Sequence, residues 1–230
     1  EESITVNTDK GEIVLNKNIA INILTIGDSF SQQGNIGYQN YLSSLGNLNI
    51  VNAKTNYFTK FGGLSSTQAL FSIVNGDLLD KLEVNYIILE NVERNFARSV
   101  YNIDMNHVFL IKDFNKKPIK KKTSKLDLGI FKDMTSHFLY NIFYNFNERA
   151  YLSDVYKVKL TKKLFSTEKN ELLFYVDDIK LLSHITKESV SGLNEKLNLL
   201  SKKLKEKGVK LIVLPAPDKY DVYRDFIENN

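Results

Sequence analysis

The feature that most constrains the fold is a set of short apolar runs rich in β-branched residues, each ending at a turn or at polar residues. The first run covers residues 19–26 and stops at Gly27, two others cover 85–90 and 209–215, and a shorter one covers 48–51. Such near-continuous runs are typical of strands covered on both faces. Helical patterns separate them, and this alternation favours a parallel sheet sandwiched between helices.

The segments between the runs carry helix signals. A helix is predicted over about 36–45, and a second begins with Ser66 as its cap and continues through Leu82. A third is predicted over about 190–207, because its leucines step by three and four residues and Gly208 supplies a C-terminal glycine.

The remaining segments predict hairpins, a loop and one more helix. Residues 4–15 predict an N-terminal hairpin, and 157–160 with 171–176 predict a second one. Residues 96–122 show no clear pattern and are interpreted as loop with short elements. Five apolar residues recur at helical spacing, and we expect them to pack into the core: Phe131, Met134, Phe138, Ile142 and Phe146.

Composition excludes several classes of protein. The chain has 230 residues, and Lys and Arg exceed Asp and Glu by only 31 − 27 = 4, which is too small an excess to indicate a nucleic-acid partner. The basic run 116–122 is interpreted as a solvated loop, with a weak contact to an anionic polymer or membrane surface as the alternative. No apolar stretch reaches the roughly 18 residues needed to span a bilayer.

The residue inventory also excludes several kinds of site. With no cysteine, the chain has no disulfide, thiolate metal site or cysteine nucleophile. No nucleotide-binding fingerprint and no cluster at metal-ligand spacing occurs, so neither a cofactor nor a metal is predicted. The chain begins with Glu1 rather than Met, and we expect either a removed signal peptide or anchor, or an internal start.

The strongest chemical signal is Gly27-Asp28-Ser29, directly after the first apolar run. In an open parallel sheet, reactive groups gather beyond the carboxyl ends of the strands. A hydroxyl at a strand-to-helix turn lies where backbone N–H groups stabilise a tetrahedral oxyanion, so the arrangement suits acyl transfer. The alternative is an Asp/Ser turn that only caps the next helix.

Three segments in order along the chain resemble one family. "ILTIGDSFS" resembles the first block of the SGNH (GDSL-like) hydrolases, and "YIILENVERN" and "IVLPAPDKYDVY" resemble segments of the SGNH-like domain of alginate O-acetyltransferases and their relatives. This resemblance implies a flavodoxin-like, three-layer α/β fold with a parallel sheet. It also implies a single domain over 1–230, incomplete at its C-terminus, with a helix and a β-hairpin inserted over 96–180.

The resemblance also implies roles for individual residues. Ser29 would be the nucleophile, and its own N–H would form part of the oxyanion hole. Gly63 or Gly62, in "FGGLSS", lies where the family has a glycine whose N–H binds the oxyanion.

A third oxyanion or substrate-binding donor is expected after the third apolar run. Arg94 is the first candidate, with Asn91 and Asn95 as alternatives, because "ENVERN" departs from the family's usual Gly-x-Asn-Asp. The competing interpretation for Glu93 and Arg94 is a structural ion pair beneath the loop.

The general base that acyl transfer needs is not evident in the sequence. The family takes its His and Asp from a block after the last strand, but no histidine follows Pro217-Asp218-Lys219. We expect structural or surface roles for His107, His137 and His184, and we expect that the segment carrying the catalytic pair is missing from this span. In the alginate enzymes the Pro-Asp-Lys segment precedes Gly-Asp-Ser, so only the reaction class is carried over.

The leading hypothesis is a serine-dependent acyl, in particular acetyl, ester hydrolase or O-acetyltransferase that acts on a carbohydrate polymer. Its partners would be a small acyl donor or an acetylated glycan, with no nucleic acid and no membrane contact beyond a removed anchor. An extracytoplasmic location, periplasmic or secreted, is expected. One alternative is a catalytically silent SGNH-like carbohydrate-binding module. Another is a phosphate or nucleotide binder that cradles an anion at 27–31.

Overall fold

A computed structural model describes these residues: 4–8, 11–15, 20–31, 37–54, 65–99, 103–110, 129–149, 153–166 and 169–228. The chain forms two compact units, one of residues 1–119 and 184–216, the other of residues 120–183 and 217–230. Each unit contains a hydrophobic cluster of its own. The single domain with an insertion at 96–180 stays a prediction.

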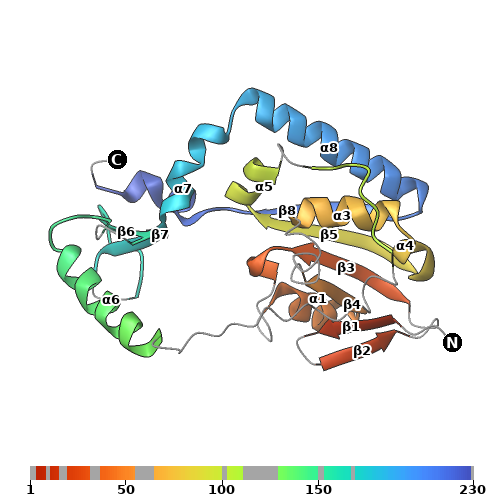
Figure 1. Ribbon diagram of the computed structural model, residues 1–230, viewed down its shortest axis with the longest axis horizontal. Helices are drawn as coiled ribbons and strands as arrows, with labels where there is room; N and C mark the ends of the chain where they lie inside the picture. Colours follow the sequence, from red (N-terminus) through yellow and green to blue (C-terminus); the bar gives the residue numbers. More distant parts are fainter. Residues whose placement is uncertain are drawn as a thin grey trace. The chain divides into compact units, whose positions relative to one another are not determined.

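The first unit is built around a four-stranded parallel sheet, in the order β4-β3-β5-β8 (Figure 1). Its strands are β3 (Ile21–Gly27), β4 (Ile50–Lys54), β5 (Val84–Val92) and β8 (Lys210–Ala216). They correspond to the four apolar runs, so the predicted α/β fold with a parallel sheet is confirmed.

Helices cover both faces of this sheet. In Figure 1, α3 (Ser66–Asn75) and α8 (Lys187–Glu206) lie on one side of the sheet and α1 (Tyr38–Gly46) lies on the other. The short helix α5 (Glu93–Ser99) contacts α3, α8, β5 and β8. The main core forms where α3 and α8 pack on the sheet, and every residue of α3 from Ser66 to Val74 is buried.

Local signals fix the ends of α8. Thr186 and Ser189 form a capping box at its start, and Gly208 follows its end with a φ of 76°, a conformation that glycine adopts without strain. The predicted end at Gly208 is therefore confirmed, whereas the helix begins a few residues before the predicted start near 190.

Two predictions about the middle of the first unit are wrong in detail. The cap of α3 is Ser65, whose side chain accepts from the N–H of Gln68, and Ser66 is the first helical residue. The helix ends at Asn75, not at Leu82, and a separate short helix, α4 (Leu78–Lys81), follows. Gly76 lies between them, where a Cβ would be only 1.8 Å from the carbonyl oxygen of Phe109. Residues 96–99, at the start of the segment predicted as loop with short elements, belong to the short helix α5.

The N-terminal hairpin is confirmed as β1 (Ile4–Thr8) paired antiparallel with β2 (Gly11–Leu15). None of the helices within the described ranges is long and apolar enough to cross a bilayer.

The second unit combines a hairpin with short helices. The predicted hairpin is confirmed as β6 (Val155–Lys159) paired antiparallel with β7 (Glu171–Tyr175), and its inward residues pack with side chains from the C-terminal segment. The helical elements are α6 (Gly129–Phe143), α7 (Val176–Lys180), α9 (Lys219–Tyr223) and the 3₁₀ turns Leu182–His184, which runs into the first unit, and Arg224–Phe226.

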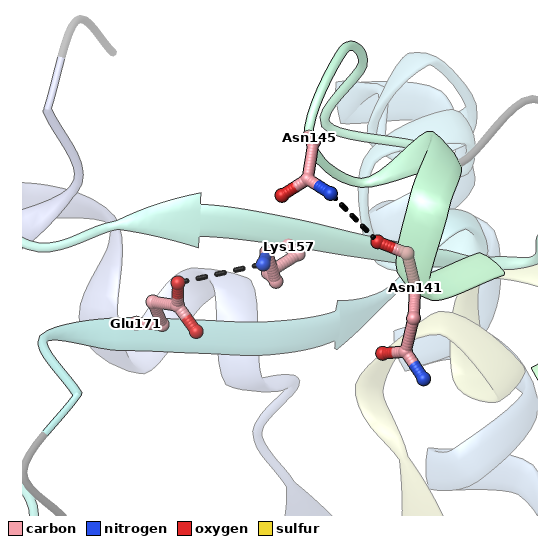
Figure 2. A network of polar contacts seen from close by, with 4 residues as sticks. All are labelled: Asn141, Asn145, Lys157 and Glu171. Carbon is pink, nitrogen blue, oxygen red and sulfur yellow. Dashed lines mark hydrogen bonds and ion pairs between the residues drawn. The ribbon is translucent and has the colours of Figure 1, made fainter. Parts of the chain in front are cut away.

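Polar contacts support this hairpin and the end of the helix before it (Figure 2). Lys157 Nζ lies 3.4 Å from Glu171 Oε1, a diagonal cross-strand pair, since Lys157 itself lies opposite Leu173. Just past the end of α6, the side-chain amide of Asn145 donates to the backbone carbonyl of Asn141, four residues earlier, at 3.2 Å.

The prediction that the apolar stripe at 131–146 packs into the core is wrong for the three side chains that the structure describes. Phe138, Ile142 and Phe146 are all exposed, with Phe146 at 84%. The side chains of Phe131 and Met134 lie outside the described residues. Helical periodicity identified the helix correctly, but it could not tell which face the neighbouring elements cover.

Candidate functional site

The strand order reverses between β3 and β5, and this reversal determines where a site can form. The chain enters at β3, moves outward to β4, and then crosses back to β5 on the other side of β3. Connections that leave neighbouring strands in opposite directions open a crevice at their carboxyl ends. The segments at that point are 28–31 after β3 and 91–95 at the end of β5 and the start of α5.

Gly27 is the last residue of β3, and no side chain fits at its position. It is paired with Glu90 of β5, and a Cβ at this position would lie 2.6 Å from the Glu90 carbonyl oxygen and 2.6 Å from Ser31 Cβ. Glycine therefore allows the turn after β3 to fold back closely over the end of the sheet.

Asp28 ties this turn to the neighbouring strand. Its Oδ1 accepts from the N–H of Phe30 at 2.9 Å, and its Oδ2 accepts from the N–H of Val92 at 2.8 Å and from the Asn95 amide at 2.7 Å. Hydrogen bonds to a charged acceptor are stronger than neutral ones. The Asp28 carboxylate thus links the end of β3 to the β5–α5 junction.

Ser29 is the exposed first residue of a 3₁₀ turn, η1 (Ser29–Ser31). Within the described ranges, neither its N–H nor its hydroxyl makes a hydrogen bond. Ser31, by contrast, is buried, and its hydroxyl donates to the carbonyl of Asp28 at 2.9 Å. The turn therefore holds one serine inward and leaves the other facing outward.

Side chains from β4 and α1 fix the far end of the turn. The amides of Asn52 and Gln39 both donate to the Ser31 carbonyl, at 2.7 and 2.8 Å. The Thr25 hydroxyl donates to the side-chain oxygen of Asn52 at 3.0 Å and so orients that side-chain amide. Because the turn is bound at both ends, the position of Ser29 is restricted before any ligand binds.

A second carboxyl group, which is buried, lies near the Asp28 carboxylate. Glu90 is 6% exposed, and its Oε2 has no hydrogen-bond partner among the residues described. Burial and then the nearby Asp28 carboxylate raise the pKa of Glu90 to about 7. Burial, and secondarily Glu90, also raises the pKa of Tyr38 at the start of α1.

The residues predicted to donate to the oxyanion or the substrate lie in different environments. Asn95 reaches the serine turn through Asp28, whereas Asn91 is buried and its side-chain oxygen accepts from the hydroxyl of Ser66 at the start of α3. Arg94 is half-buried in the first turn of α5, and its ion pair with Glu93 stays a prediction. Gly62 and Gly63 lie outside the described residues.

Histidine contacts are found elsewhere in the chain. His107 Nδ1 lies 2.8 Å from the Ser72 hydroxyl, and the backbone carbonyl of His107 accepts from Asn75, so it helps to hold residues 103–110 against α3. His137 and His184 are exposed. No histidine hydrogen-bonds to Ser29 within the described part of the chain.

Sequence reasoning missed the polar layer beneath the turn. Asp28 was identified only as part of a tripeptide, and Glu90 only as the end of an apolar run. A charged residue that directly continues a buried strand is a signal in itself, because such a group is rarely buried without a reason.

Comparisons with protein families, with curated proteins and with solved structures find no match for this chain. Its function is therefore inferred from the residues of the site.

Proposed function

We propose that this chain is a serine-dependent ester hydrolase or O-acetyltransferase of the SGNH type, with Ser29 as its nucleophile and an acetylated carbohydrate as its substrate. The observation that carries the proposal is the exposed hydroxyl of Ser29, on a turn fixed at both ends, at the reversal of strand order. The sheet order, with helices on both faces, is compatible with the flavodoxin-like fold that the SGNH resemblance implies.

The proposed reaction begins when Ser29 Oγ attacks the ester carbonyl carbon. The hydroxyl proton passes to a general base, and the carbonyl oxygen becomes an oxyanion. The N–H of Ser29 is available to this oxyanion, since it has no partner among the described residues. Collapse breaks the ester bond, the proton goes to the leaving alcohol, and the acyl group stays on Ser29 until water or a sugar hydroxyl removes it.

Residues at the start of α5 are the proposed partners of the substrate. Asn95 is already held at the serine turn by Asp28, and Arg94 precedes it in the same helical turn. A cationic or amide donor at this position would bind the oxyanion or a sugar hydroxyl. Asn91 is a weaker candidate, because it is buried and bonded to Ser66.

The runner-up is a silent carbohydrate-binding module on the same scaffold. It is favoured by one observation, namely that no histidine hydrogen-bonds to Ser29 in the part of the chain described. Such a module would keep the crevice but would not form an acyl-enzyme.

The test is hydrolysis of p-nitrophenyl acetate by the wild type, Ser29→Ala and Ser201→Ala. Ser201 is an exposed serine on α8 and provides a matched control. We expect at least about a hundredfold loss of kcat/KM in Ser29→Ala and no change in Ser201→Ala. Full activity in Ser29→Ala would remove the catalytic assignment. An inactive wild type that binds acetylated glycans on an array would support the silent module.

A further inference from the structure

An apolar pocket opens on the helical face of the first unit, away from the serine turn. It has a volume of about 250 Å³, and its walls come from α5, α8 and β8. Phe96 supplies one wall, Leu193 and Leu197 supply the α8 wall, and Val213 supplies the sheet side. Asn95 binds Asp28 whereas the next residue, Phe96, lines the pocket, so α5 separates the two places.

The pocket offers a ligand mainly apolar contact. Apart from Glu93, the polar side chain in its lining is Ser189, whose oxygen is committed to the capping box of α8. It accepts from the N–H of Thr186 and donates to the carbonyl of Thr186, both at 2.9 Å. A ligand would therefore be held by apolar burial rather than by hydrogen bonds to this serine.

Two branched side chains at the pocket remain in contact with water. Ile185 is 38% exposed and Val190 is 54% exposed. Both line the same cavity as the buried Phe96, so a small apolar molecule that entered it would cover part of their surface. Removing such surface from water is favourable in proportion to its area.

We propose that this pocket binds a small, neutral, apolar ligand of about eight non-hydrogen atoms, the number that its volume holds at roughly 30 Å³ each. The ligand class is an aliphatic chain or a single ring with at most one hydroxyl. This site is distinct from the Ser29 turn, and the proposal does not depend on Ser29 being catalytic.

The test uses 1-heptanol as the probe and saturation-transfer NMR on the intact chain. We expect saturable binding, and about fifty-fold weaker binding of 1-butanol, because it buries three fewer methylenes at about 0.8 kcal/mol each. Leu193→Phe should fill the pocket and weaken 1-heptanol binding at least about tenfold. Leu45→Phe, at an exposed position of α1, is the matched control and should bind as the wild type does.

If Leu193→Phe fails to fold, a second pair of variants tests whether the pocket binds 1-heptanol. Val190→Asp places a charge at the pocket in the first turns of α8, where an acidic residue is compatible with the helix dipole. It should weaken 1-heptanol binding about tenfold, whereas Val222→Asp, exposed on α9, should not. Absence of saturable binding to the wild type, or equal affinity in Val190→Asp and Val222→Asp, would overturn the proposal. These outcomes do not depend on whether Ser29→Ala loses esterase activity.

Discussion

Asp28 provides the sharpest test of how the serine turn is held. Replacing it with alanine removes the acceptor of three donors, namely the N–H groups of Phe30 and Val92 and the side-chain amide of Asn95. The Phe30 bond is exposed, so water replaces it at little cost. The other two donors are partly buried, and each then lacks an acceptor.

The magnitude follows from those two donors. A partly buried donor left without a partner costs about 1–3 kcal/mol, so the loss of two acceptor contacts in Asp28→Ala should lower the free energy of unfolding by about 2–6 kcal/mol. Asp28→Asn should lose less, about 1–2 kcal/mol, because its amide oxygen still accepts from Val92 and Asn95 while its NH₂ faces the Phe30 N–H. Asp80→Asn is the control, since it removes only a surface pair with Lys207 and should cost about 0–1 kcal/mol.

The assay is urea unfolding followed by circular dichroism, combined with hydrogen exchange at the amide of Val92. In the wild type that amide should be protected, and in Asp28→Ala its exchange should approach the rate of a solvent-exposed amide. A double-mutant cycle with Asn95→Ala should give a coupling energy of about 1 kcal/mol or more. If Asp28→Ala and Asp80→Asn unfold at the same urea concentration and the Val92 amide stays protected in Asp28→Ala, Asp28 does not hold the two segments together.

Three further predictions concern the same unit. Glu90→Gln should flatten the pH dependence of stability. The pKa of Glu90 is raised from 4.5 to about 7, so between those pH values the folded state retains a proton that the unfolded state loses. The free energy of unfolding of the wild type should therefore fall by as much as about 3 kcal/mol over this range, as urea titrations at pH 4.5 and 8 would show. Gly27→Ala should cost at least about 1–3 kcal/mol, because its Cβ would meet the backbone oxygen of Glu90, and an unchanged melting temperature would contradict the close approach. Thr186→Ala should cost about 0.5–2 kcal/mol through loss of the capping box, whereas Thr186→Ser should restore most of it in thermal melts.

The parallel sheet could be predicted from the sequence because its strands are buried on both faces and therefore form continuous apolar runs. The end of α8 was equally predictable, because Gly208 at a positive φ is a local signal. The exposure of α6 was not predictable, because a helical stripe records only which residues share a face. Whether Phe138 and Phe146 are covered depends on elements distant in sequence.

The position of Ser29 after the first buried strand was predictable from the sequence, whereas the polar contacts beneath it were not. A strand followed by Gly-Asp-Ser indicates the carboxyl edge of a sheet, and Ser29 is exposed there. Two of the three partners of Asp28 lie more than 60 residues away, and they depend on β5 lying next to β3. Strand order is a property of the whole fold, so no local pattern could have identified Val92 and Asn95 as those partners.

The most direct test of the central claim is covalent labelling of the protein with a fluorophosphonate, followed by peptide mass mapping. The serine hydroxyl displaces fluoride from phosphorus, so an activated nucleophile becomes phosphonylated while ordinary serines do not. The account predicts a single modified site at Ser29, and no modification in Ser29→Ala. Modification at another serine, or none under conditions that label a known serine esterase, would contradict it.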